Sequence, residues 1–229
     1  MRLAQKTPLA LIFTVVFVDL LGFGILVPIL PAFAVTQLGA SETFVGVAIA
    51  TYSFIQFLFN PVFGSLSDKY GRRHIIVFTL LINATGYIIF AFSHSWWMLL
   101  LSRVVSGIGG STIGVAQAYI ADITTKQERA KGMGLIGVAF GLGFVFGPLI
   151  GGVLAEFGYM VTGFASAGAS FMAFVFCFFF LPEPPNKVFG GQKDKVFDFQ
   201  AAKRILSNPS ISISILLVFI IIFSVANIY

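Results

Sequence analysis

Two charged side chains, Asp19 and Arg103, lie inside long apolar segments of this sequence. An ionised group at the centre of a membrane-inserted helix costs about 2.5–3.5 kcal/mol, so a sequence that retains one usually uses it. A nearby guanidinium favours the ionised carboxylate, whereas an apolar surrounding favours the protonated form, so an acid subject to both can take up and release a proton. We therefore interpret Asp19 and Arg103 as a proton-coupling pair in one hydrated crevice. A static ion pair between two helices is the alternative.

Polar and small residues near these charges are candidates for a path through the membrane. Gly107 and Gly110 follow Arg103 at helical spacing, which suits either a close helix contact or a water-lined passage. Three further polar side chains are candidates for lining a substrate path, although a local hydrogen bond would explain each of them alone: Gln56, Asn83 and Gln117.

A short loop carries a second group of charges at the end of an apolar segment. A helix C-terminus is electronegative, so Asp68 needs a cationic partner there, and Arg72 and Arg73 lie just across a glycine turn. Asp122 is expected at the same depth. We predict an ion-pair latch that breaks and reforms as helices move, with an ordinary basic loop as the alternative. The predicted gate residues are Gly64, Asp68, Gly71, Arg72, Arg73 and Asp122.

The segment 132–155 is dense in glycine, which lets another helix approach closely, and its proline permits a kink. A static dimerisation face is the alternative, and spacing does not separate the two. The residues of this glycine motif are Gly137, Gly141, Gly143, Gly147, Pro148, Gly151 and Gly152.

Seven apolar segments must position these residues. Each approaches the roughly 20 residues that cross a bilayer core, and helices are expected because lipid offers no partners to strand edges. Thirteen of the 14 Lys and Arg residues lie on one side of the predicted spans, which places that side and the N-terminus in the cytoplasm of a cell membrane. The predicted spans are 8–31, 43–67, 75–92, 96–121, 132–155, 157–182 and 209–229.

The composition excludes several classes of protein. Only 10% of residues are charged and 58% are hydrophobic, which no soluble domain of this size could bury. The basic residues follow the membrane topology, so nucleic acid is not an expected partner. The single cysteine, Cys177, excludes an intrachain disulfide, and neither a metal site nor a catalytic constellation is visible. We expect no enzyme and no cofactor, with a proton gradient as the energy source.

The chain divides into three predicted parts: a six-helix bundle at 1–182, a cytoplasmic linker at 183–208 and a seventh helix at 209–229. Within the linker, Asp198 could begin a short helix on the membrane surface, with a disordered tether as the alternative. The last span ends at Tyr229 without a polar tail. We therefore expect a truncated second half, and either the missing half or a second copy would be needed to complete a cavity.

Four segments, in order, resemble signatures of the major facilitator superfamily. The run 64–73 resembles its loop between the second and third helices, and 101–107 resembles its fourth-helix arginine motif. The run 141–152 resembles the fifth-helix motif of proton-driven antiporters. The run 19–22, followed by two prolines, resembles the first helix of the drug:proton antiporter branch, and bacterial tetracycline exporters are similar over the first six spans.

The resemblance implies an all-α, multi-spanning fold of two six-helix halves around a central cavity, each half built from two inverted three-helix repeats. It implies proton coupling by Asp19 and Arg103 and an inner gate at Asp68, Arg72 and Asp122. A tetracycline exporter would carry an acid near Gly86, which is absent here. That argues against tetracycline as the substrate and leaves efflux intact.

The predicted function is proton-coupled efflux of small amphipathic or aromatic compounds by alternating access. One alternative is a transporter of the same fold that works without protons or imports its solute. Another alternative is a truncated membrane module that transports nothing and binds a partner membrane protein.

Overall fold

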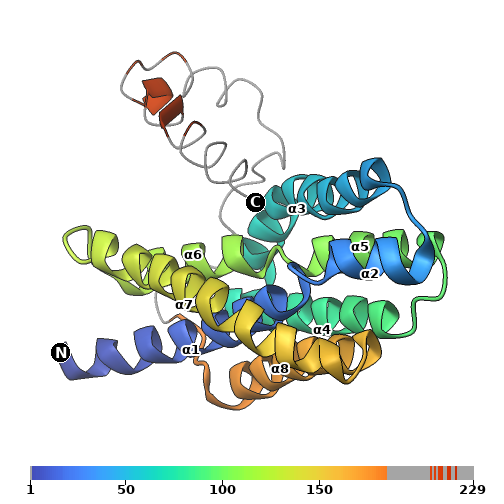
Figure 1. Ribbon diagram of the computed structural model, residues 1–229. Coiled ribbons are helices and arrows are strands. Elements are labelled where there is room, and N and C mark those ends of the chain that lie inside the picture. The colour runs from blue at the N-terminus through green and yellow to red at the C-terminus, as the bar shows by residue number, and fades with distance from the viewer. Residues whose placement is uncertain are drawn as a thin grey trace. The chain divides into compact units, whose positions relative to one another are not determined.

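A computed structural model describes residues 2–184 and a few positions between 207 and 220. Contacts divide the chain into two units, Met1–Gly191 and Gln192–Tyr229, of which the first holds the helices described below. The predicted linker helix and most of the predicted seventh span lie outside the described residues. The described part of the first unit is all-helical (Figure 1), with α1 at Arg2–Leu26, α2 at Leu30–Leu38, α3 at Glu42–Tyr70, α4 at Arg72–Ala91, α5 at Trp96–Gly109, α6 at Thr112–Ile123, α7 at Arg129–Glu156 and α8 at Tyr159–Phe180.

These helices form six segments that are long and apolar enough to cross a membrane, among the residues described. The predictions of an all-α fold and of a multi-pass membrane protein are confirmed. The first span extends well past the predicted end at position 31. In order, the six spans are Thr7–Leu38, Glu42–Tyr70, Arg72–Ala91, Trp96–Ile123, Arg129–Glu156 and Tyr159–Phe180.

The first and fourth spans are each broken into two helices, which the sequence analysis did not anticipate. In the first span, α1 ends at Leu26 and α2 begins at Leu30, because Pro28 and Pro31 have no backbone N–H to continue the hydrogen-bond ladder. In the fourth span, the break between α5 and α6 falls at Gly110 and Ser111. The fifth span, by contrast, continues through Pro148 as one helix.

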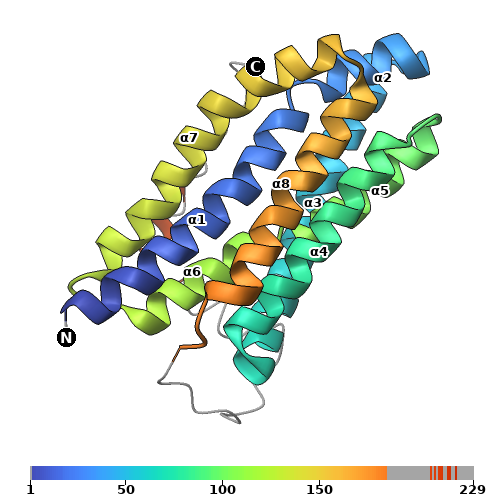
Figure 2. The same cartoon turned by 90° about the horizontal axis from the view of Figure 1, so that it is seen from below.

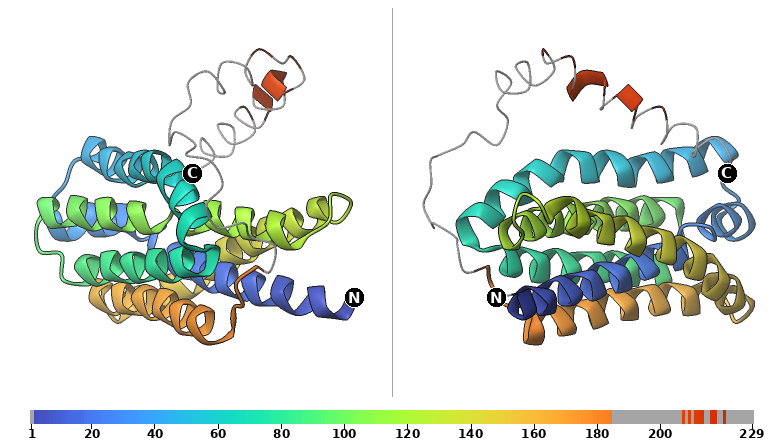
Figure 3. Two further views of the ribbon diagram at one scale, coloured as in Figure 1. Left: turned by 180° about the vertical axis from the view of Figure 1, so that it is seen from behind. Right: turned by 90° about the vertical axis from the view of Figure 1, so that its left-hand side faces the viewer.

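The packing of the six spans follows one pattern twice. The helix α1 packs against α7 and α8, while α5 packs against α3 and α4. Figure 2 shows α1 between α7 and α8, and the two further views of Figure 3 show the helices running side by side along the bundle. Because α4 and α8 pack against each other, exchanging the first three spans for the last three leaves the list of neighbours unchanged. This equivalence is what two three-helix repeats require.

Two apolar clusters fill the bundle, one toward each end. The cluster nearer the charged loop after α3 includes Ile12, Ile76 and Tyr119, and the cluster toward the other end includes Leu26 and Phe90. Between them, buried polar side chains form a layer across the middle of the bundle. We call the end that carries the loops after α3 and α6 the basic end. The polar layer comprises Asp19, Asn83, Ser102, Arg103, Ser106, Ser166 and Ser170.

Candidate functional site

The carboxylate of Asp19 lies inside the bundle and is only 4% exposed. Its Oδ1 accepts one hydrogen bond of 2.8 Å from Nδ2 of Asn83 on α4 and another of 2.7 Å from Oγ of Ser170 on α8. Nδ2 of Asn83 also lies 3.3 Å from Oγ of Ser170. The acid therefore joins three helices, from the first, third and sixth spans. Ser170 was not among the predicted site residues, because no local sequence signal distinguishes it from the other serines of α8.

Arg103 is equally enclosed, at 1% exposure on α5. Its Nε donates to Oγ of Ser102 at 3.3 Å, and the guanidinium carbon lies 5.6 Å from the ring centroid of Phe90. Its Nη2 has no hydrogen-bond partner among the described residues. Stacking on an aromatic face partly compensates a buried guanidinium.

The structure shows no ion pair between Asp19 and Arg103, which the sequence analysis gave as the alternative to a proton-coupling pair. The ion pairs found within 4 Å among the described residues involve neither side chain. Both residues lie in the polar layer, but Asp19 takes neutral donors from α4 and α8 instead. The sequence could not decide this, because it does not show which helix faces carry the two residues.

The three candidates for a substrate path have different surroundings. Asn83 is 2% exposed and bound to Asp19, so it belongs to the buried cluster around that acid. Gln56 donates from Nε2 to the carbonyl of Gly110 at 2.8 Å, exactly where the fourth span is broken, and so satisfies an acceptor that the break releases. Gln117 on α6 is exposed. Only Gln117 is therefore open to a solute in this structure.

The acid that the resemblance places near Gly86 would not fit at that position. A Cβ built on Gly86 would lie 2.6 Å from the backbone nitrogen of Ser106 on α5. The glycine lets α4 and α5 approach closely, so an acidic side chain there would require the two helices to separate.

At the basic end, Arg72 holds two acids together. Its guanidinium forms an ion pair with Asp68 at the end of α3, and its Nε donates to Oδ2 of Asp122 on α6 at 2.8 Å. Its Nη1 also donates to Oγ of Ser67 at 2.6 Å. The side chain of Asp122 is 32% exposed, so its ion pair with the buried Arg72 is partly desolvated, whereas the side chain of Asp68 is 63% exposed and its ion pair is screened by solvent. Gly64, the first predicted gate residue, accepts the hydroxyl of Ser67 through its carbonyl.

Arg73, the other candidate partner of Asp68, points elsewhere. Its guanidinium donates to the carbonyl of Phe178 on α8 and lies 5.8 Å from the ring centroid of the same residue. Of the two arginines that could neutralise Asp68, the structure thus uses Arg72 alone.

The turn between α3 and α4 consists of one residue, Gly71, at φ +107°. Such a backbone strains any residue with a Cβ, and a Cβ here would also lie 3.0 Å from the carboxylate of Glu183. Glu183 accepts hydrogen bonds from the backbone N–H groups of Arg72 and Arg73 and so caps the N-terminus of α4. The sequence analysis missed this contact because the two partners are more than 100 residues apart.

The glycine motif of α7 divides into two faces. Gly143, Gly147 and Gly151 face α1, and a Cβ on Gly147 would lie 2.6 Å from Cα of Gly24. Gly137, Gly141 and Gly152 have no atom of the described residues within 4 Å of a Cβ built on them. Close packing against α1 therefore explains three of the six glycines of the motif: Gly143, Gly147 and Gly151. Pro148 lies between the two faces at intermediate exposure.

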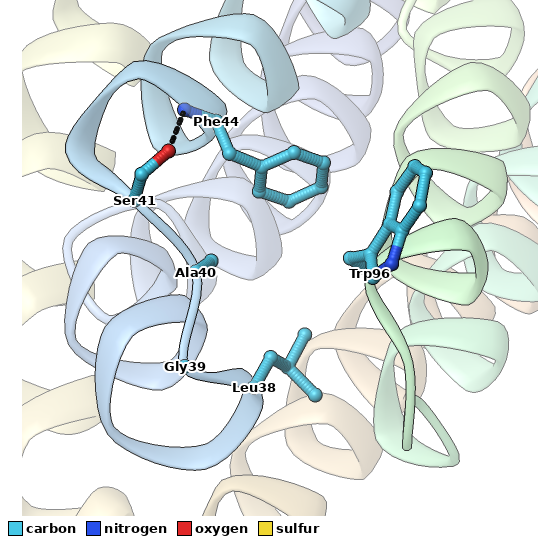
Figure 4. A pocket seen from close by; sticks show the side chains of 6 residues that line it. All are labelled: Leu38, Gly39, Ala40, Ser41, Phe44 and Trp96. Carbon is cyan, nitrogen blue, oxygen red and sulfur yellow. Dashed lines mark hydrogen bonds between the residues drawn. The ribbon is translucent and has the colours of Figure 1, made fainter.

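A shallow pocket of about 240 Å³ lies at the end opposite the basic end (Figure 4). Leu38, Phe44 and Trp96 form its apolar walls, and Ser41 caps α3 beside it by accepting from the N–H of Phe44. None of the predicted site residues lines it. A tryptophan at this depth is typical of the membrane–water interface. Among the described residues, no group of three His, Cys, Asp or Glu side chains is placed to hold a metal ion.

A family model, related sequences and solved structures all show similarity between this chain and membrane transport proteins. Residues 12–229 match the sequence model of the Major Facilitator Superfamily. The class B tetracycline resistance protein of Escherichia coli is 37% identical over 185 residues, which are 80% of this chain and 45% of that protein. Multidrug resistance protein 2 of Bacillus subtilis (strain 168) is 33% identical over 78% of this chain and 45% of its own length.

Solved structures resemble the fold as well. The human organic anion transporter MFSD10 (TETRAN) superimposes with a TM-score of 0.71 at 28% identity, over 86% of this chain and 52% of that one. The POT family transporter PepTSo gives a TM-score of 0.66 at 20% identity, which speaks to the fold alone. The chain thus spans about half the length of the relatives it matches.

Proposed function

The chain belongs to the major facilitator superfamily, and from this premise we propose that it exports small amphipathic or aromatic compounds in exchange for protons, by alternating access. The observation that carries the proposal is the carboxylate of Asp19, 4% exposed in the middle of a membrane span with neutral hydrogen-bond donors. A buried acid with no cation within ion-pair distance can hold a proton without breaking a salt bridge. The relatives named for tetracycline and multidrug resistance support efflux as the direction of transport.

In this proposal Asp19 carries the exchanged proton and Arg103 supplies a neighbouring positive charge in the same polar layer. When Asp19 is ionised, the carboxylate is stabilised by Asn83 and Ser170. When Oδ1 carries the proton, it donates to Oγ of Ser170 instead of accepting from it, and it can still accept from Nδ2 of Asn83. The site therefore stays intact in both states, as a carrier that alternates between them requires.

The basic end would face the cytoplasm, and the cluster of Asp68, Arg72 and Asp122 would form its gate. The positive-inside rule supports this orientation. The ion pairs tie the end of α3 to α6 through the first residue of α4, and breaking them would free those helices to separate. The other half of a two-half transporter, or a second copy of the chain, would complete the cavity. No cofactor is proposed, because the proton gradient supplies the energy.

The test is substrate accumulation in everted membrane vesicles of cells that express the gene, driven by an imposed proton gradient. We expect Asp19→Asn to abolish gradient-driven transport, because an amide of the same shape cannot exchange a proton, while the protein still inserts. Glu42→Gln, at an exposed acid in the first turn of α3, is the matched control and should transport normally. Normal transport by Asp19→Asn would reject the proposal.

The gate is tested by replacing each of two neighbouring arginines with lysine, because Arg72 binds two acids and Arg73 binds a backbone carbonyl. Arg72→Lys should lower the transport rate about tenfold, because a lysine cannot bind two acids and Ser67 at once with a planar fork. Arg73→Lys should have a much smaller effect, because Arg73 has no acid within ion-pair distance among the described residues. Equal losses in the two variants would argue against a specific role for the Arg72 cluster.

A further inference from the structure

Three polar atoms next to Asp19 are fully enclosed and have no hydrogen-bond partner among the described residues: Oδ1 of Asn83, the hydroxyl of Tyr87 and Oγ of Ser166. Their side chains are at most 2% exposed. A buried polar atom without a partner costs about 1–3 kcal/mol, so such atoms are rare and each calls for an explanation. Three of them beside one functional acid call for a common explanation.

The packing of α4 against α8 places two of these atoms face to face. The two helices run antiparallel, since Asn83 contacts Ser170 and a Cβ on Gly163 would lie 2.8 Å from Cα of Ala91. Tyr87 lies one turn after Asn83 on α4, and Ser166 lies one turn before Ser170 on α8. Because the helices are antiparallel, both turns lead away from the basic end and place Tyr87 level with Ser166. The two unpartnered hydroxyls therefore lie at the same height, about 5.4 Å beyond the pair that binds Asp19.

The helix α1 closes the third side of this place. Its Gly22 lies so close to α8 that a Cβ there would come within 2.9 Å of the carbonyl of Ser166 and 3.6 Å of Oγ of Ser170. The absence of a side chain at Gly22 keeps α1 near the hydroxyls without covering them. The two hydroxyls can donate or accept, and Oδ1 of Asn83 can only accept. No two of these groups are bonded to each other, whereas a molecule with two donors and two acceptors can bond to all three.

We propose that Asn83, Tyr87 and Ser166 bind internal water between α1, α4 and α8, and that this water exchanges protons with Asp19 through Ser170. Buried waters in proteins make about three hydrogen bonds to otherwise unsatisfied groups, which is the number of atoms available here. The inference rests on the proposed role of Asp19 and names the groups through which that acid gains and loses its proton.

The last step of the relay runs through Ser170. Its hydroxyl already donates to Oδ1 of Asp19 at 2.7 Å. In one step, Ser170 gives this proton to Oδ1 of Asp19 and takes another from a protonated water, H3O⁺, which is left as neutral water. The serine is unchanged at the end, the carboxylate has become a carboxylic acid, and the reverse sequence returns the proton.

The first experiment asks whether water is present, in the unmodified full chain. Hydroxyl radicals generated by X-rays label side chains that contact bound water, including enclosed ones. Tyr119 is the matched control, because it is also 0% exposed but its hydroxyl donates to the carbonyl of Pro182 at 2.7 Å. We expect Tyr87 to be labelled at least about five times faster than Tyr119, given that only Tyr87 has an unsatisfied hydroxyl to offer water. Equal, slow labelling of the two tyrosines would overturn the proposal.

The second experiment asks whether the water carries protons. The double variant Tyr87→Phe with Ser166→Ala removes both hydroxyls and adds no bulk, and we expect gradient-driven efflux to slow at least about tenfold. Thr85→Val is the control on the same helix, because its exposed hydroxyl bonds only to the carbonyl of Leu81. An unchanged rate in a correctly inserted double variant would overturn the relay.

The outcomes separate this inference from the proposed function. If Asp19→Asn abolishes gradient-driven efflux but the double variant retains the original rate, only the relay is rejected. If Asp19→Asn transports normally, the proposed function itself fails. The labelling experiment needs no variant, so it decides the presence of water even if the double variant does not fold.

Discussion

Two of the tight helix crossings lie at equivalent places in the repeat pattern and are built from different residues. Where α1 crosses α7, glycine meets glycine: Gly24 faces Gly143 and Gly147. Where α3 crosses the broken fourth span, Gly107 lies against the carbonyl of Tyr52, and Gly110 lies against the side chains of Tyr52 and Gln56. The first crossing brings two glycine backbones together, and the second also uses large polar side chains.

The difference has a physical origin in the break of the fourth span. An interrupted helix releases backbone carbonyls, which need donors when no water is present. Tyr52, Gln56 and Asn60 follow one another at four-residue spacing on α3, and the middle one donates to the carbonyl of Gly110. The other crossing lies just before the break of the first span, and there glycines on both helices let the two backbones approach to van der Waals contact. The α1–α7 crossing thus depends on shape, and the α3–α5 crossing depends on hydrogen bonding.

The strongest way to break this comparison is to add bulk to the crossing that depends on shape. Gly147→Leu should destabilise the folded chain by at least about 3 kcal/mol, because its side chain would collide with the backbone of α1. Unfolding in detergent, followed by circular dichroism, measures the change. Gly141→Leu is the control on the same helix, since no described atom lies near that position, and it should unfold like the unmodified chain. Similar losses in both variants would contradict the assignment of the two faces of α7.

The second prediction removes the hydrogen bond from the other crossing. Gln56→Leu leaves the carbonyl of Gly110 with only the longer 3.4 Å bond from the N–H of Ile113 and should cost about 1 kcal/mol of folding free energy. Thr51→Val is the control on α3, because the hydroxyl of Thr51 is exposed and bonds to its own helix. The same unfolding assay compares them. A Gln56→Leu variant as stable as its control would show that shape alone holds this crossing as well.

The smallest effect is expected one turn further along α3. Oδ1 of Asn60 is enclosed beside Gly114 and has no hydrogen-bond partner among the described residues. Asn60→Leu should therefore change the folding free energy by less than about 1 kcal/mol in either direction, since the polar atom it removes makes no bond. A loss as large as that of Gln56→Leu would show that the side chain of Asn60 also makes a stabilising hydrogen bond across this crossing.

The sequence predicted those parts of the fold that depend on local composition. Apolar runs of sufficient length identified the six described spans, and the short loop after α3 was enough to bring Asp68 and Arg72 within reach of each other. The breaks in the first and fourth spans were missed because a proline or a pair of glycines is compatible with a kink, a break or a continuous helix. Pro148 illustrates this, since α7 runs through it without interruption.

The partners of the site residues were harder to predict, because they depend on which helix faces meet. Asp19 finds Ser170 at a separation of 151 residues, and nothing near Ser170 marks it among the serines of α8. Glycines four residues apart occur on both faces of α7, as Gly143 and Gly147 on one and Gly137 and Gly141 on the other, so spacing alone could not tell the packed face from the open one. Only the three-dimensional arrangement of the helices resolves such choices.

The cap that Glu183 forms on α4 has a mechanical consequence. The carboxylate is tethered to the backbone of Arg72 and Arg73, only a few residues after α8 ends. Tension on the polypeptide just beyond this anchor would pull on the first turn of α4, whose leading residue binds Asp68 and Asp122. The contact of Glu183 thus ties the residue just after the sixth span to the helix turn that carries the ion pairs of Arg72.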